Sequence, residues 1–61
     1  MTARQLITRL ESEGWFEVDQ KGSHKQFKHN DKPGRVTVPV HGNKDIPKGT
    51  LASISRQAGW K

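Results

Sequence analysis

Hydrophobic and polar residues follow two different periods along the chain, and the first of these is helical. Between residues 2 and 14, apolar side chains recur at intervals of three and four, at Ala3, Leu6, Ile7 and Leu10. Residues spaced in this way lie on the same face of a helix, so they form one apolar stripe. Thr2 followed by Gln5 fits a capping box, and Gly14 provides a stop. The pattern predicts a helix over residues 3–13.

The middle of the chain changes to a period of two, which is typical of strands. Alternating segments span residues 15–20, 23–30 and 35–40. Lys21-Gly22 forms the turn between the first two segments, and residues 30–34 are dense in turn formers. The pattern predicts three antiparallel strands joined by short turns.

Alternation also assigns the side chains of the strands to two faces. Phe16 and Val18 share the apolar face in the first strand, and Phe27 marks the core side of the second. On the third strand the core side bears Val36, Val38 and Val40. The opposite face is predicted to carry His24, Gln26, Lys28, Arg35 and Thr37. Pro39 cannot donate a ladder hydrogen bond, so this end of the third strand is expected to be an edge of the sheet or the point where the chain leaves it.

The last apolar stripe is helical again and consists of Leu51, Ile54 and Ala58. Pro47 is tolerated near the start of this helix, Gly59 ends it, and Trp60 can fold back against it. The order helix, strand, strand, strand, helix predicts an α+β fold, in which both helices cover one face of a three-stranded antiparallel sheet. Functional side chains are then expected on the face that the helices leave open.

Size and charge narrow the class of protein. The 61 residues predict a single domain spanning positions 1–61, and 11 Lys and Arg against 6 Asp and Glu give a net charge of +5. Such a charge favours a polyanionic partner, nucleic acid first, although solubility alone or an acidic protein partner also accounts for it. The chain has no cysteine, no apolar run of membrane length and no signal-peptide core, so a cytoplasmic protein is expected.

The open face offers histidine chemistry and little else. The acidic residues are scattered, and no pair of histidines has the helical spacing of a zinc site, so neither a paired-carboxylate site nor a metal site is predicted. His24 lies among basic residues and small residues. A histidine can move a proton near neutral pH, and cations stabilise the charge that develops on a phosphate during RNA cleavage. The alternative is that His24 is an inert, exposed histidine at the start of a strand.

The other aromatic and histidine residues have simpler interpretations. His29 is predicted to be a surface residue at the end of a strand, whereas His41 either caps the loop after the sheet or lines the site. Trp15 and Trp60 are interpreted as packing residues. The predicted RNA contacts, from cations, a permissive glycine and a hydroxyl donor, are Lys21, Gly22, Ser23, Lys25, Lys28 and Arg35.

Three motifs in this order resemble a known family of toxins. They are Gly22-Ser23-His24 with Phe27, then Val36-Thr37-Val38-Pro39-Val40-His41, then Ile46-Pro47-Lys48-Gly49-Thr50-Leu51 with Ile54 and Gln57-Ala58-Gly59. Together they cover nearly the whole chain and are similar to the HicA toxin family. The resemblance implies a fold like that of double-stranded-RNA-binding domains, and a catalytic role for His24.

The same resemblance implies an activity and a partner. It implies the toxin of a type II toxin–antitoxin system, an endoribonuclease or mRNA interferase that cleaves mRNA and inhibits translation and growth. It also implies a HicB-type antitoxin that binds and neutralises the toxin, and it implies no cofactor. Two alternatives stay open: a non-catalytic RNA-binding module, and a subunit whose basic face meets an acidic protein.

Overall fold

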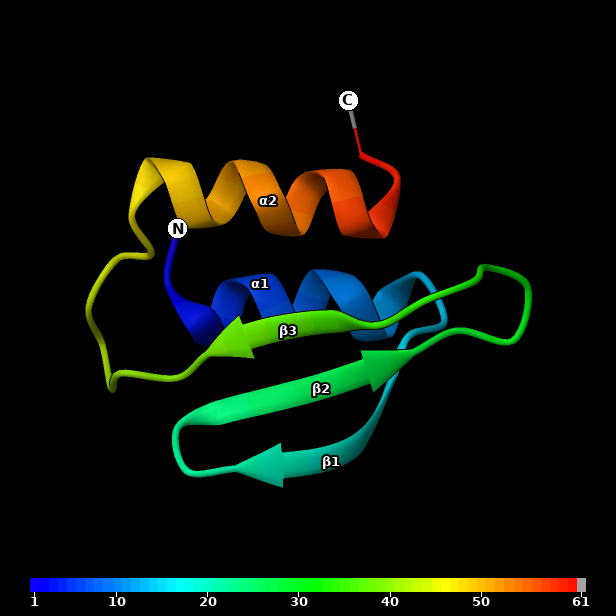
Figure 1. The fold of residues 1–61 in the computed structure, drawn as a ribbon. Coiled ribbons are helices and arrows are strands. Elements are labelled where there is room, and N and C mark those ends of the chain that lie inside the picture. Colours follow the sequence, from blue (N-terminus) through cyan, green and yellow to red (C-terminus); the bar gives the residue numbers. More distant parts are fainter. Residues whose placement is uncertain (61) are drawn as a thin grey trace.

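The computed structural model of the chain, which describes residues 1–60, has the predicted order of elements (Figure 1). The elements are helix α1 (Ala3–Ser12), strands β1 (Phe16–Lys21), β2 (His24–Lys28) and β3 (Val36–Pro39), and helix α2 (Lys48–Ala58). The strands form one antiparallel sheet in the order β1-β2-β3. Within residues 1–60, no helix is long and apolar enough to cross a membrane.

Helix α1 begins where its sequence signals predict. The Thr2 hydroxyl accepts a hydrogen bond from the Gln5 amide over 3.2 Å, and the Gln5 side chain accepts one from the Thr2 amide over 2.9 Å. This capping box satisfies backbone donors that the first turn of a helix leaves without partners. The predicted stripe is buried at Ala3, Leu6 and Leu10, and Ile7 packs at the margin of the core.

Both helices pack on one face of the sheet, as predicted. The core residues of the sheet are Phe27, Val36 and Val38, and they are fully buried. Helix α1 contributes Leu6 and Leu10 to the same cluster, and α2 contributes Ile54 and Ala58. The α+β fold with one open sheet face is therefore confirmed.

Strand β3 is an edge of the sheet, which agrees with the position of Pro39. The amide of Thr37 points away from β2 and donates a hydrogen bond to Gln57 Oε1 on α2, over 3.3 Å. Alternate amides of a strand point to opposite sides, so the next position that faces outward is Pro39, which has no amide hydrogen.

The predicted faces of the first strand are wrong. Phe16 and Val18 remain 41% and 40% exposed, whereas Trp15, which precedes the strand, is buried. A bulge between Glu17 and Asp19 breaks the alternation of the strand. The Trp15 amide donates to the carbonyl of Leu10 over 3.0 Å, and this contact holds the indole under α1. Trp15 therefore fills the place in the core that the alternation assigns to Phe16.

The first turn and the start of the last helix are placed differently than predicted. Strand β1 continues through Lys21, so the first hairpin turns at Gly22 and Ser23. Pro47 is the N-cap of α2. The helix ends at Gly59, whose φ of 78° is the left-handed conformation that glycine adopts readily. Trp60 then folds back as predicted, and its amide donates to the carbonyl of Ser55 over 2.7 Å.

Candidate functional site

His24 is the first residue of β2 and lies in the centre of the sheet at the end where the β1–β2 turn is located (Figure 1). Its direct partners across the sheet are Lys21 on β1 and Pro39 on β3. Directly opposite residues in antiparallel strands share a face, and this face is opposite to that of the buried Phe27. The structure therefore places the exposed residues His24 and Lys21 next to each other, on the side that the helices leave open.

The turn before His24 brings backbone to the surface. Gly22 has a φ of 57°, and nothing lies within 4 Å of the place where a Cβ would stand. A glycine at the first central position of a two-residue turn matches the twist of the flanking strands. The carbonyl of Ser23 accepts a hydrogen bond of 2.6 Å from the Val40 amide, which extends the pairing of β2 and β3 beyond Pro39. The turn is thus open to a ligand and is held against the segment that follows β3.

The predicted phosphate contacts divide between the two faces. Lys28 lies on the same face as His24, about 13 Å along the strand at roughly 3.3 Å per residue. Arg35 joins this face through a hydrogen bond of 2.8 Å from its guanidinium to Gln26 Oε1. Lys25 lies on the other face, and its Nζ is 3.4 Å from Glu17 Oε1. The structure brings Lys21, Gly22 and Ser23 close to His24 and separates Lys25 from them.

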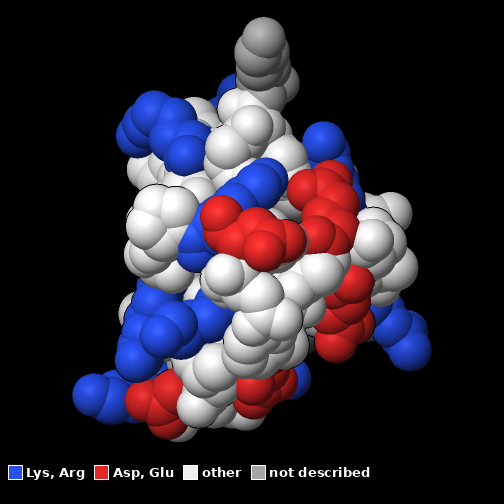
Figure 2. Space-filling view, turned by 90° about the vertical axis from the view of Figure 1, so that its right-hand side faces the viewer, with Lys and Arg blue, Asp and Glu red and all other residues white. Residues whose placement is uncertain are grey.

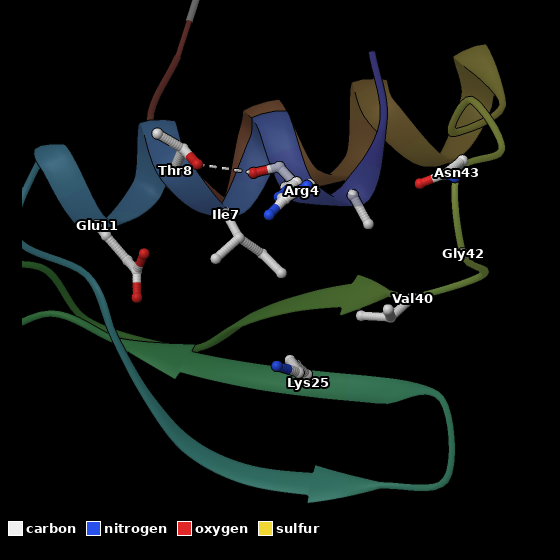
Figure 3. Close-up of a pocket in the computed structure, with 9 residues that line it drawn as sticks. Arg4, Ile7, Thr8, Glu11, Lys25, Val40, Gly42 and Asn43 are labelled. Carbon is white, nitrogen blue, oxygen red and sulfur yellow. Dashed lines mark hydrogen bonds between the residues drawn. The ribbon is translucent and has the colours of Figure 1, made fainter.

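A cleft lies on the helix side of the sheet (Figure 3). This cleft of about 500 Å³ separates α1 from the sheet, and its walls combine Arg4, Ile7 and Glu11 of α1 with Lys25 and Val40. His24 does not line it. The cleft lies on the helix side of the sheet and His24 lies on the open side, so the cleft and the open face are separate features.

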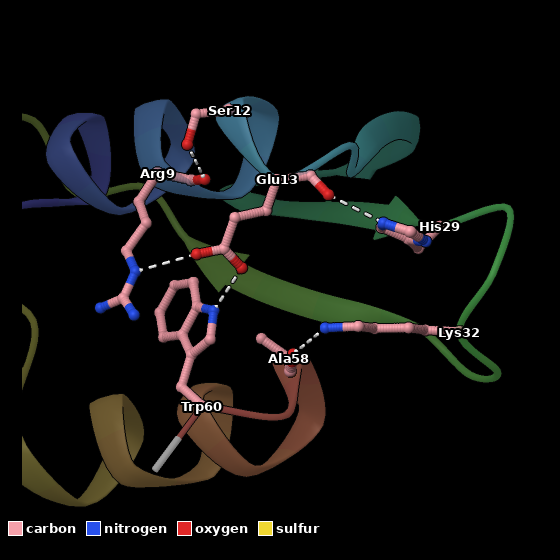
Figure 4. A network of polar contacts seen from close by, with 7 residues as sticks. All are labelled: Arg9, Ser12, Glu13, His29, Lys32, Ala58 and Trp60. Carbon is pink, nitrogen blue, oxygen red and sulfur yellow. Dashed lines mark hydrogen bonds and ion pairs between the residues drawn. The ribbon is translucent and has the colours of Figure 1, made fainter.

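A cluster of polar groups fixes the opposite end of the molecule (Figure 4). Glu13, at the end of α1, accepts hydrogen bonds from Trp60 Nε1 over 2.7 Å and from Arg9 Nε over 3.2 Å. The Arg9 guanidinium also lies over the Trp60 ring, 3.9 Å from its centroid. Figure 2 looks onto this end of the molecule, where acidic side chains gather near the middle of the view. The cluster ties Trp60 to α1.

His29 belongs to this end, just beyond β2, where it is half-buried and makes more contacts than the sequence predicts. Its Nδ1 accepts a hydrogen bond from the Asp31 amide over 2.9 Å, so Nε2 carries the hydrogen that it donates to the Glu13 carbonyl over 2.8 Å. The ring also meets Trp15 edge-on, with 5.2 Å between the ring centroids. Both nitrogens have structural partners, which leaves His29 without a free group for proton transfer. Nothing in its sequence spacing indicates these partners.

Low pH should weaken the hydrogen bonds that Glu13 accepts from Trp60 and Arg9. The hydrogen bond from Trp60 lowers the pKa of Glu13 below its ordinary value, with Arg9 and Lys32 adding to the effect against a smaller opposing effect of burial. A carboxyl group with a lowered folded-state pKa stabilises the fold above its unfolded pKa, and this contribution is lost as the pH falls through the folded value. We therefore expect Glu13→Gln to reduce the dependence of stability on pH below about pH 5.

Urea unfolding at pH 7 and pH 3 checks this expectation. At pH 7, Glu13→Gln should cost no more than about 1 kcal/mol, because the carboxylate is partly exposed. At pH 3 the variant and the parent protein should differ less in their free energy of unfolding than at pH 7. Glu11→Gln, at an exposed carboxyl group on the same helix, is the matched control. An equal pH effect in both variants would contradict the role given to Glu13.

Within the described part of the chain, no group of three His, Asp or Glu side chains comes close enough to hold a metal ion. His24 and His29 lie at opposite ends of β2, with His29 just beyond the strand. The candidate site therefore consists of the histidine and cations on the open face. Its position was predictable from strand alternation, whereas the pairing of His24 with Lys21 depended on which residues form the turn.

Comparison with known proteins adds a family. A family model described as the HicA toxin of bacterial toxin–antitoxin systems matches residues 3–60. No curated protein matches the chain. A solved structure described as a toxin–antitoxin complex from Streptococcus pneumoniae contains a chain that is 30% identical, with a TM-score of 0.76, and the match covers 97% of both chains. The match spans both helices and all three strands, and the chain belongs to the HicA toxin family.

Proposed function

We propose that this protein is the toxin of a type II toxin–antitoxin system and acts as a metal-independent endoribonuclease on mRNA. The observation that carries the proposal is the exposed His24 beside Lys21, on the sheet face that the helices leave open, in a chain of the HicA family. Cleavage of mRNA stops translation and growth, and it takes place in the cytoplasm, where mRNA is translated.

The proposed chemistry uses the nucleophile that RNA already contains. The 2′-oxygen attacks the adjacent phosphorus while its proton is removed, and the bond to the 5′-oxygen breaks while that oxygen gains a proton. The products are a 2′,3′-cyclic phosphate and a 5′-hydroxyl. His24 moves one of the two protons, and Lys21 stabilises the charge that grows on the phosphate oxygens.

The open face also suits the binding of a phosphate chain. Lys21, Lys28 and Arg35 lie along it, and the Gly22-Ser23 turn allows close approach of backbone or hydroxyl to a phosphate. Lys25 is the weakest of the predicted contacts because it lies on the other face, paired with Glu17. Binding through these cations releases counterions, so RNA affinity should fall steeply as salt increases.

The backbone donors at the two edges of the sheet bear on where a partner binds, and they support contact through the open face. On β3, the outward amide of Thr37 is already bonded to Gln57, and Pro39 has none. On β1, the amide of Gln20 donates to Asp19 Oδ1 over 2.8 Å, next to the bulge. Bulges and occupied donors discourage the addition of a further strand. Two backbone donors at the edges, those of Gln20 and Thr37, are therefore already bonded, which supports contact through the open face.

A HicB-type antitoxin is the proposed protein partner. The related chain of known structure is part of a toxin–antitoxin complex, which supports an antitoxin for this chain as well. A partner with acidic groups that covers the open face pairs with the same cations that would bind RNA, and it excludes the substrate from His24. Binding of RNA and of antitoxin should then be mutually exclusive.

Purified protein incubated with an end-labelled transcript tests the activity. We expect new ends that carry a 2′,3′-cyclic phosphate, formed at an unchanged rate in excess EDTA. Loss of cleavage in EDTA would contradict the metal-independent mechanism. Binding without new ends would instead favour a non-catalytic RNA-binding module, an alternative that the charge and the open sheet face also suit.

A further inference from the structure

We propose that His41 is the second proton-transfer group of the site, so that His24 and His41 work as an acid–base pair. The inference rests on the proposed ribonuclease function and adds a catalytic residue to it. Its basis is the register of β2 and β3, which brings the end of β3 beside the turn that precedes His24.

The register sets the separation of the two histidines. His24 lies opposite Pro39, and the bond from the Val40 amide to the Ser23 carbonyl carries the pairing one residue beyond β3. His41 is therefore two positions beyond the residue opposite His24, a diagonal relation that spans about 7–8 Å. Figure 1 shows the β1–β2 turn and the segment after β3 at the same end of the sheet.

Alternation favours the same face for both rings. Val36 and Val38 are buried on the core side, and Val40 also packs against the core. The residues on either side of Val40 are Pro39, which shares the face of His24, and His41, which is exposed. His41 thus emerges beside the open face at its His24 end.

The loop that carries His41 is fixed at both ends. Its start is held by Val40, and the Lys44 amide turns back to the His41 carbonyl over 3.4 Å, with Gly42 at a φ of 63°. Its end is held by a hydrogen bond of 2.8 Å from the Ile46 amide to the Met1 carbonyl. A catalytic group needs such restraint, because small displacements reduce the rate strongly.

The three histidines differ in what their rings contact. Both nitrogens of His29 are bonded to backbone groups at the far end of the sheet. Among residues 1–60, neither His24 nor His41 has a hydrogen-bond partner for its ring, and both are exposed. The two histidines with free rings are therefore the two that lie at the same end of the sheet.

Two proton-transfer groups match the chemistry of RNA cleavage. The attacking 2′-oxygen and the leaving 5′-oxygen lie roughly in line on opposite sides of the phosphorus. One neutral histidine takes the proton of the 2′-hydroxyl as the new bond to phosphorus forms. The other histidine, protonated, gives its proton to the 5′-oxygen as the old bond breaks. The phosphate lies between the two rings, with Lys21 on the other side of His24.

Two RNA substrates separate the acid from the base. One is ordinary RNA, and in the other sulfur replaces the bridging 5′-oxygen at the cleavage position, so that the leaving group departs without a proton. On ordinary RNA, His41→Gln and His24→Gln should each lose about 10²–10⁴-fold in rate. On the sulfur substrate, the variant that lacks the general acid should regain most of the lost rate. The variant that lacks the general base should stay slow.

Several results would overturn the pair. His41→Gln cleaving ordinary RNA at close to the parent rate would do so, as would rescue of neither variant or of both by sulfur. Asn43→Ala, in the same loop, should cleave normally, and a loss of rate as large as that of His41→Gln would point to loop structure instead.

Unchanged thermal unfolding of His41→Gln would confirm that the variant folds, and an unfolded variant would contradict the exposed placement of His41. If the parent protein itself cleaves no RNA, the proposed function fails together with the pair; if only His24→Gln is inactive, the pair alone fails.

Discussion

Replacing His24 by glutamine should lower the rate of RNA cleavage by about 10²–10⁴-fold, which is the usual contribution of one general acid or base. Glutamine keeps a polar side chain of similar reach but cannot exchange a proton at neutral pH. The imidazole is exposed, so no packing is lost and the fold should be unchanged. Cleavage of a labelled transcript at saturating protein measures the effect.

Two further measurements separate chemistry from binding. RNA affinity of His24→Gln should remain close to that of the parent protein, because Lys21 and Lys28, two of the proposed phosphate contacts, are unchanged on the open face. Arg4→Gln, which removes a cation from the helix side, is the control and should cleave within about twofold of the parent rate. Expression of His24→Gln without antitoxin should no longer arrest growth. Cleavage by this variant at the parent rate would remove His24 from the mechanism.

Much of the fold follows from local signals. The capping box at Thr2 and Gln5, the alternating valines of β3 and the left-handed Gly59 each specify an element within a few residues. These signals depend on hydrogen bonds or side-chain spacing inside one segment, so a sequence contains them in full. The open face and the place of His24 on it follow from the same alternation.

Contacts between distant residues were not predictable in this way. The bulge at Val18 changes the faces of β1 beyond Glu17, and Trp15 is buried in place of Phe16. The partners of His29 are a carbonyl 16 residues away and an amide in the next loop, neither of which has a sequence signature. For His24, alternation predicts the position, and the resemblance to HicA toxins implies the proposed catalytic role.

Phe27→Ala should bring the protein close to unfolding. Phe27 is fully buried at the centre of the core, and truncating such a residue costs about 3–5 kcal/mol. At about 0.05–0.15 kcal/mol per residue, the whole domain is stable by only about 3–9 kcal/mol. Each kcal/mol lowers the melting temperature of so small a domain by about 4–8 °C, so a loss of more than about 12 °C is expected.

Phe16→Ala is the matched control, because both phenylalanines lie in strands and the alternation of the sequence puts both on the core face. The structure instead pairs Phe16 with Lys28 on the open face and leaves it 41% exposed. Its truncation should cost about 1 kcal/mol, since part of the ring stays in water in the folded protein. Thermal unfolding of the two variants side by side tests the register of β1. Similar losses in both would mean that Phe16 lies in the core, and that the bulge is misplaced. A small loss for Phe16 alone keeps this side chain on the face where Lys28 and His24 are proposed to meet RNA.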